Sequence, residues 1–303
     1  MRLILCLMLL PLSAFGQSIS NIRLESSHDK VWVLYDLQAT APQDVSIVFV
    51  SDTKGKVVPK LISGALIRVP AGVNHRIDWE ALKDVGAFEG DLYAELSIVS
   101  CKGVITDVDG NQYNTIKFGT QCWTQSDLKV SKYRNGDNIP TGLSDAQWGS
   151  TTSGAYAMYN NDAANDALYG KLYNWYAVND ARGLCPTGWH VPSDGEWTTL
   201  TTFLGGEAVA GGAMKSTAIQ PTPGGWYAPN TGATNSSGFT GLPGGNRFSG
   251  GGFGGLGNYG TWWSDSDADS GLAWDRSLDY DGAGAFRNYD YHRVGFSVRC
   301  ARD

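Results

Sequence analysis

Residues 185–197 read Cys-Pro-Thr-Gly-Trp-His-Val-Pro-Ser-Asp-Gly-Glu-Trp, and most of the chain after residue 100 can be organised around them. Ser193 is followed three residues later by Glu196, which is the pattern of a capping box at the start of a helix. Apolar side chains then recur at helical spacing, at Trp197, Leu200, Phe203 and Leu204. The pattern predicts an amphipathic helix of about three turns that lays an aromatic face on a sheet.

This stretch resembles the signature of the Fibrobacter succinogenes major paralogous domain, a module of secreted bacterial proteins. Further segments resemble the family pattern: Asp109-Gly110-Asn111, Gly119 to Trp123, Leu172 to Val178, Gly238 to Gly245, Trp262-Trp263-Ser264 and Gly295 to Cys300. Together they cover about residues 104–303. The resemblance implies an α+β fold of the C-type-lectin-like kind, and a fold-level analogy extends to its sulfatase-modifying-factor branch.

The first residues have the pattern of an export signal. Arg2 precedes an apolar run from Leu3 to Leu12, and Ala14-Phe15-Gly16 is a small-x-small cleavage site. The run is too short to span a bilayer, and no later segment approaches the roughly 18 apolar residues that a span requires. We therefore predict a cleaved signal peptide at residues 1–16, no membrane span in the mature chain, and a secreted or cell-surface location.

Composition agrees with an exported globular protein. The net charge of −7 disfavours nucleic acid as a partner, because phosphate binding needs a basic surface. The chain has 39 glycines and 11 tryptophans but few charges, which is typical of a loop-rich β or α+β protein.

Four cysteines follow the predicted signal peptide: Cys101, Cys122, Cys185 and Cys300. An even number in an exported chain indicates two disulfides, for which there are three pairings. We favour Cys101–Cys122 and Cys185–Cys300, of which the second would tie the stretch before the helix to the last strand, as C-type-lectin-like folds do. The alternative, a metal site, lacks paired C-x-x-C spacing and nearby histidines.

Residues 17–100 contain short runs rich in Val, Ile, Tyr and Trp, separated by polar or Gly/Pro breaks. Such spacing predicts an all-β sandwich of the immunoglobulin or fibronectin-III kind over residues 17–100, followed by the C-type-lectin-like module over 101–303. The sandwich would be a spacer or docking module, or a folded appendage with no separate activity.

Two local patterns predict a turn and a helix in the first part of the second module. Asp109-Gly110-Asn111 lies between strand-like runs, which favours a hairpin turn over a calcium loop. A second helix is predicted at about 167–181, with its aromatic stripe in the core, from the spacing of Leu168, Leu172, Trp175, Tyr176 and Asn179.

The glycine-rich segment 205–261 is predicted to be mostly irregular. In C-type-lectin-like folds a long loop region occupies this part of the chain and often carries binding residues. Trp226 and Tyr227 are adjacent there, and flat rings on a loop suit stacking on sugar rings. The alternative is that the two rings only pin the loop down.

Asp265, Asp267 and Asp269 would supply hydrogen-bond acceptors at the rim of that aromatic platform. Alternating carboxylates also occur in calcium loops, but Ser270 and Arg276 stand where an EF-hand needs glycine and glutamate. A solvated acidic loop is therefore favoured over calcium, and no cofactor or resident metal is predicted.

The chain lacks G-x-S-x-G, H-E-x-x-H and Walker patterns, and its four histidines are scattered. These observations favour an exported non-catalytic binding or adhesion protein, with an extracellular glycan or an envelope protein as partner. The first alternative is a structural or assembly component of the envelope. The second is an oxidase-like relative of the sulfatase-modifying enzymes, whose reactive cysteine pair would correspond to Cys185 and Cys300.

Overall fold

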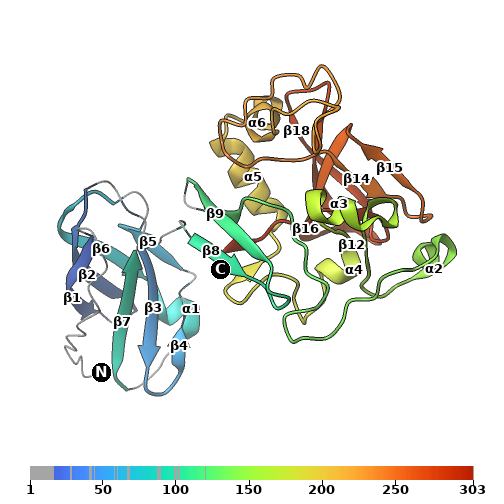
Figure 1. Ribbon diagram of the computed structural model, residues 1–303. Coiled ribbons are helices and arrows are strands. Elements are labelled where there is room, and N and C mark those ends of the chain that lie inside the picture. Colours follow the sequence, from blue (N-terminus) through green and yellow to red (C-terminus); the bar gives the residue numbers. More distant parts are fainter. Residues whose placement is uncertain are drawn as a thin grey trace. The chain divides into compact units, whose positions relative to one another are not determined.

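The computed structural model describes residues 17–302 except 28, 41, 42, 44, 58, 60, 67, 68, 87–89, 99, 100, 102 and 120. The predicted signal peptide, residues 1–16, lies outside the described residues. The chain divides into two compact units, residues 1–100 and 101–303, and strands outweigh helices (Figure 1). Among the described residues, no helix is both long and apolar enough to cross a membrane.

The first unit consists of two antiparallel sheets and one short helix. One sheet has the order β1 (Ser18–Ser26), β2 (Val31–Gln38), β6 (Gly72–Trp79) and β5 (Ile62–Gly64). The other has the order β4 (Gly55–Val57), β3 (Val45–Ser51) and β7 (Leu92–Ile98), and α1 spans Ala81–Val85.

Alternation along the strands explains why these two sheets share one core. In β2 every second side chain is buried, from Val31 to Leu37, as expected for a strand with one face turned inward. Phe49 of β3 stacks on Trp79 of β6 with their ring centroids 4.1 Å apart, which joins the two sheets.

The second unit also contains two sheets. The smaller has the order β13 (Trp189–His190), β20 (Ala301–Arg302), β10 (Gln121–Thr124), β9 (Gln112–Phe118) and β8 (Gly103–Thr106). The larger has the order β11 (Tyr156–Ala157), β12 (Leu172–Asn174), β19 (Gly295–Phe296), β14 (Gly244–Arg247), β16 (Tyr259–Asp269), β17 (Leu272–Asp279) and β18 (Ala285–Tyr291), with β15 (Phe253–Leu256) paired to β14.

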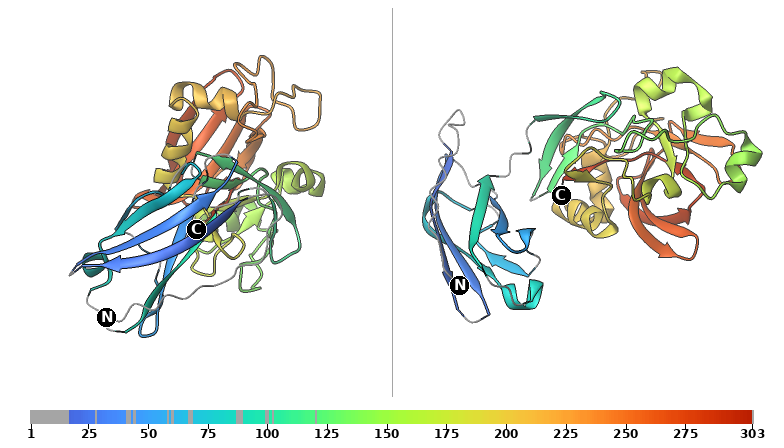
Figure 2. Two further views of the ribbon diagram at one scale, coloured as in Figure 1. Left: turned by 90° about the vertical axis from the view of Figure 1, so that its left-hand side faces the viewer. Right: turned by 90° about the horizontal axis from the view of Figure 1, so that it is seen from below.

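The helices of the second unit are short. They are α2 (Asp145–Ser150), the 3-10 turn η1 (Tyr159–Asn161), α3 (Ala163–Tyr169), α4 (Trp175–Val178), α5 (Asp194–Phe203) and α6 (Glu207–Met214). Figures 1 and 2 show α5 and α6 side by side, and both contact strands of the larger sheet. The two helices therefore cover part of one face of that sheet.

The helix predicted from residues 193–204 is confirmed as α5. The Ser193 hydroxyl accepts from the Glu196 backbone N–H at 3.2 Å, and the Glu196 carboxylate accepts from the Ser193 N–H at 2.8 Å. Trp197 is fully buried and lies 4.7 Å from the ring of Trp123. Phe203 differs from the predicted buried stripe, since it is 56% exposed at the end of the helix.

Removing the cap of α5 should cost a modest amount of stability. Ser193→Ala removes the oxygen that accepts from the first turn, so we expect the free energy of unfolding to fall by about 1 kcal/mol. Urea unfolding measures the change. Thr199→Ala, on the exposed face of the same helix, is the control and should stay within about 0.5 kcal/mol of the parent. Equal losses in both variants would contradict a capping role.

The predicted hairpin turn at Asp109-Gly110-Asn111 is confirmed between β8 and β9. Asp107 organises the turn, because its carboxylate accepts from the backbone N–H of Asp109 and of Asn111, both at 2.9 Å. Tyr113 donates its hydroxyl to the same carboxylate at 2.6 Å.

The single helix predicted at about 167–181 is wrong. Gly170 adopts a φ of 77° and ends α3. Residues 172–174 then form β12, which pairs with β11 and β19. The Asn174 side chain caps the one-turn helix α4 by accepting from the Ala177 N–H at 3.1 Å. Apolar spacing could not separate a helix from this strand, because strand pairing depends on residues distant in sequence.

The segment 205–261 is more regular than predicted, since it contains α6, β14, β15 and the start of β16. Irregular chain is concentrated between α6 and β14, where Gln220–Pro221 and Ala228–Pro229 are cis peptide bonds.

Candidate functional site

Two cavities with three lining residues in common lie in the second unit. Their volumes are about 390 Å³ and 230 Å³, and both are lined by Asn179, Asp180 and Ala181, which directly follow α4. We call the pair the 179–181 cleft. Its larger cavity is further lined by Thr152, Ser153, Gly154, Trp175, Tyr176 and Arg182. The volume of the larger cavity lies at the lower end of the range of small-molecule sites, about 300–1,000 Å³.

Charged and aromatic side chains define the larger cavity. Arg182 donates to the Asp180 carboxylate at 2.9 and 2.8 Å and to Asp137 at 3.1 Å, and its guanidinium lies 3.9 Å from the centroid of the Tyr133 ring. The hydrogen bonds from Arg182 hold the pKa of Asp180 below its usual range. Asp180 therefore presents an ionised acceptor at neutral pH.

Two aromatic residues of α4, the buried Trp175 and the half-buried Tyr176, contribute to the lining of the same cavity. The Trp175 ring is stacked on His292 with centroids 4.1 Å apart, and the Tyr176 ring meets His292 edge-on at 5.6 Å. Trp175 also donates its indole N–H to the Ser264 carbonyl at 3.0 Å, which holds the ring in place. The cavity thus combines flat rings with polar groups of both signs.

The smaller cavity is lined by polar groups from four segments, at Arg134, Asn179 with Asp180, His190 and Asp265. His190 lies with Nε2 2.9 Å from the Glu196 carboxylate, which also belongs to the capping box of α5. Arg134 donates to the carbonyl oxygens of Cys185 and Trp189 at 2.8 and 2.7 Å. Burial raises the pKa of Asp265, whose side chain faces the same cavity.

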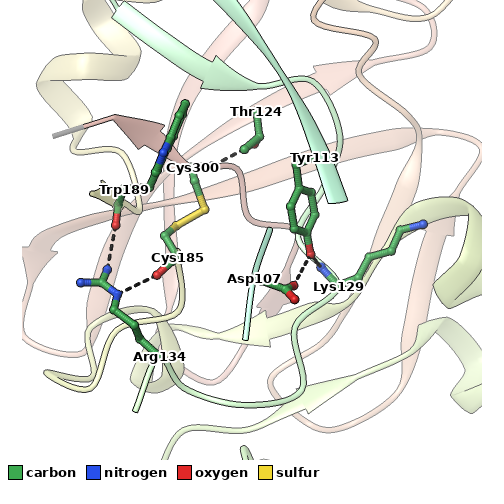
Figure 3. Close-up of a disulfide and its surroundings, with 8 residues drawn as sticks. All are labelled: Asp107, Tyr113, Thr124, Lys129, Arg134, Cys185, Trp189 and Cys300. Carbon is green, nitrogen blue, oxygen red and sulfur yellow. Dashed lines mark hydrogen bonds between the residues drawn. A yellow bond between two sulfur atoms is a disulfide. The ribbon is translucent and has the colours of Figure 1, made fainter. Parts of the chain in front are cut away.

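Both disulfides are the favoured ones, Cys101–Cys122 and Cys185–Cys300. The second lies at the smaller cavity, to which Cys185 contributes, and both of its cysteines are buried. Figure 3 shows Arg134 reaching the carbonyl of Cys185, while the Cys300 N–H donates to the Thr124 hydroxyl at 3.1 Å. The disulfide thereby fixes the segment before α5 to the C-terminal strand.

The predicted platform of Trp226 and Tyr227 is not formed. Trp226 is fully buried in the core with Trp197 and Trp262, and its indole N–H donates to the Gly241 carbonyl at 3.2 Å. Only Tyr227 reaches the surface, at 48% exposure. The cause is local pairing: Trp226 bridges Ile219, which turns the indole inward to a site where its N–H finds a partner.

The three aspartates also lie apart from those rings. The Tyr227 N–H donates to the Gly257 carbonyl, two residues before β16 begins, whereas Asp265 is six residues beyond the strand's start. At about 3.3 Å per residue, that is roughly 20 Å along the strand. Asp265 lines the smaller cavity, Asp267 lies 3.1 Å from His292, and Asp269 accepts from the Ser270 N–H.

No group of three or more His, Cys, Asp or Glu side chains in the described ranges is arranged to hold a metal ion. The three aspartates therefore have different neighbours, and the structure does not bring them around one point.

Sequence reasoning missed the residues that line most of the cleft. Asn179-Asp180-Ala181 fell inside the helix predicted at about 167–181, with Arg182 directly after it, and Arg134 lies in a polar region with no recognisable pattern. A loop at this position could have been predicted from the polar run Asn-Asp-Ala-Arg-Gly, which follows the apolar and aromatic residues 175–178. Such a run is typical of a loop at the edge of a packed element.

These features define a strand-rich, disulfide-linked domain with a shallow polar and aromatic cleft at the end of α4. The family model of the Fibrobacter succinogenes major domain matches residues 116–302, and the chain belongs to this family. No curated protein and no solved structure matches the chain.

Proposed function

We propose that this is an exported, non-catalytic binding or adhesion protein that acts at or outside the cell surface and takes a glycan in the 179–181 cleft. The observation that carries the proposal is the composition of the cleft. The half-buried Tyr176 lines the larger cavity together with the Asp180–Arg182 pair, and Asn179 lines both cavities. Rings that contact the apolar faces of a sugar, with amide and charged groups for its hydroxyls, match this composition.

Disulfides support the exported location, since such bonds persist in oxidising compartments. The Cys185–Cys300 bond also supports binding over the oxidase-like alternative, because both sulfurs are buried and joined to each other. A pair of this kind has the character of a structural disulfide rather than of a reactive thiol.

The proposal also includes a specific fold type for each of the two units. The strand orders β1-β2-β6-β5 and β4-β3-β7 support an immunoglobulin-like or fibronectin-III-like sandwich, since they parallel the ABED sheet and the C and F strands of that fold. The bond between the start of α5 and the C-terminal strand, together with the irregular chain between α6 and β14, supports a C-type-lectin-like second unit.

Filling the cleft at the residue that lines both of its cavities should weaken glycan binding. Asn179 is exposed and lines both cavities, so Asn179→Lys places a longer side chain there without removing a core contact. We expect signals of residues 17–303 on a glycan array to fall by at least about tenfold, which corresponds to about 1.4 kcal/mol of binding free energy.

The matched control is Thr187→Lys, which makes the same change of charge at an exposed position outside the cleft and should bind like the parent. Thermal melting should be the same for all three proteins. A parent that binds no glycan would overturn the proposed function, and an Asn179→Lys variant with parental binding would remove the cleft from it.

A further inference from the structure

A second surface of the same unit carries exposed rings that the core does not use. Trp274 of β17 is paired with Tyr289 of β18, and Tyr291 follows two residues later, so the three side chains share one face of the sheet. Tyr289 and Tyr291 are 58% and 62% exposed, and the ring of Tyr289 meets Trp274 edge-on at 5.6 Å. We call these three side chains the aromatic row.

The row begins where the helical cover of the sheet ends. Further along the same face, Leu278 and Ala285 are fully buried, and α6 contacts β18. Figure 1 shows α6 at one end of β18. Beyond this cover a solvent-facing sheet surface ordinarily carries polar side chains, so the exposed rings need a separate explanation.

A network of charged groups holds the row in position. The Arg287 guanidinium lies 3.3 Å from the centroid of the Trp274 ring and donates to the Asp194 carboxylate at 2.9 Å from both Nε and Nη2. Asp194 also accepts from the buried Arg276 at 2.8 Å. The base of the row is therefore ordered before any ligand arrives, which lowers the entropic cost of binding.

The charges around the row select against polyanions. The exposed Asp269 of β16 lies in register with Leu272, which is in register with Tyr291, so this carboxylate is on the face of the row. Among the described residues, Arg287 is the only cation in contact with these rings. Its guanidinium is already paired with the Asp194 carboxylate. An anionic polymer would be repelled by the Asp269 carboxylate, whereas a neutral one would find in it an acceptor for a hydroxyl group.

The area of the row is small for a protein partner. At about 200 Å² per aromatic side chain, the exposed parts of Tyr289 and Tyr291 amount to roughly 250 Å². A stable protein–protein interface buries about 800 Å² on each partner. Two or three ring-sized contacts in a line instead match successive pyranose rings of one chain.

We propose that the aromatic row binds a neutral polysaccharide chain by stacking of its pyranose rings on Tyr289 and Tyr291, an inference that rests on the proposed glycan-binding function. The chain would continue towards the 179–181 cleft, because His292 follows Tyr291 directly and stacks on Trp175 of that cleft. The row adds affinity for long polymers, and the cleft holds the segment that is recognised.

The test compares one glucan backbone in neutral and anionic form. Residues 17–303 are run in native gels that contain neutral hydroxyethyl cellulose or anionic carboxymethyl cellulose. A gel with galactomannan tests a second neutral polymer. We expect retardation by a neutral polymer and little by the anionic one. Tyr289→Ala/Tyr291→Ala should weaken retardation at least about tenfold, since it removes both exposed rings on which the polymer would stack. Tyr289→Phe/Tyr291→Phe keeps the rings and should retain most of the affinity.

Phe286→Ala is the matched control, because Phe286 is 47% exposed on the same strand but points to the opposite face. It should be retarded like the parent, and melting should be unchanged in every variant. Parental retardation of the double alanine variant, or an equal loss with Phe286→Ala, would overturn the aromatic row. If the aromatic row were overturned but Asn179→Lys still lost binding on the glycan array, the proposed function would stand without the row. A parent that binds neither array nor polymer would overturn both.

Discussion

Asp127→Ala is expected to lower the free energy of unfolding of the second unit by about 3–5 kcal/mol. Asp127 and Arg299 form an ion pair in which the carboxylate is 4% and the guanidinium residue 1% exposed. The same carboxylate accepts from the indole N–H of Trp262 at 2.8 Å. Removing it leaves a buried charge and a buried donor without their acceptor.

Arg299 cannot escape to solvent when its partner is lost. It donates to the carbonyl oxygens of Thr124 and Phe239 at 2.9 and 3.0 Å, and its guanidinium lies 4.2 Å from the Phe239 ring centroid. Burial lowers the pKa of Arg299, and Asp127 opposes this effect. The neutral oxygens that remain do not balance the charge.

The measurement is urea unfolding at neutral pH, followed by tryptophan fluorescence. Asp127→Ala/Arg299→Met is the informative companion, because it removes the charge together with its partner. We expect the double variant to be more stable than Asp127→Ala alone, since a buried pair can be replaced by apolar groups at little cost. If the single variant unfolded like the parent, this ion pair would not hold the C-terminal strand in the core.

Asp275→Asn is expected to stabilise the second unit at pH 8 and to leave its stability almost unchanged at pH 4. Burial raises the pKa of Asp275 from its ordinary value of 3.8 to about 8, the Asp290 carboxylate adds to the rise, and Arg276 opposes it. Between these values the unfolded chain releases the proton, whereas the folded chain keeps it. The stability of the parent should therefore fall as the pH rises from 4 towards 8.

At about 1.36 kcal/mol for each pKa unit, the loss between pH 4 and pH 8 is on the order of 5 kcal/mol. The amide of Asp275→Asn does not ionise, so its stability profile should be flatter than that of the parent. Urea unfolding at pH 4, 6 and 8 measures both profiles. Asp269→Asn makes the same exchange on an exposed side chain and should keep the parental slope. Identical slopes for the parent and Asp275→Asn would contradict the shifted pKa.

Local patterns were sufficient for several elements. Ser193 and Glu196 lie within one helical turn, so the start of α5 is decided by interactions that can be read directly from the chain. The turn after β8 is decided by Asp107 and the residues that immediately follow it. In β2, a run rich in Val, Trp, Leu and Tyr identified a strand, and the structure showed that every second side chain is buried.

Local patterns failed where a distant partner decides the outcome. Leu172 lies at helical spacing with its neighbours, but pairing with β11 and β19 makes residues 172–174 a strand. Trp226 looked like a surface ring, but Gly241 and Ser216 offer acceptors for its indole N–H inside the core. An adjacent pair of rings in the sequence was therefore divided between core and surface.

The sequence by itself determined the family, the position of α5 and the division into strand-rich segments, because these depend on neighbours a few residues apart. Only the tertiary structure decided where candidate binding groups gather. The 179–181 cleft needs the loop after α4 to lie beside His190 and Asp265. The aromatic row needs the register of β17 with β18 and the point at which α6 stops covering the sheet. Both depend on pairing and packing between segments far apart in the chain, which local spacing does not specify.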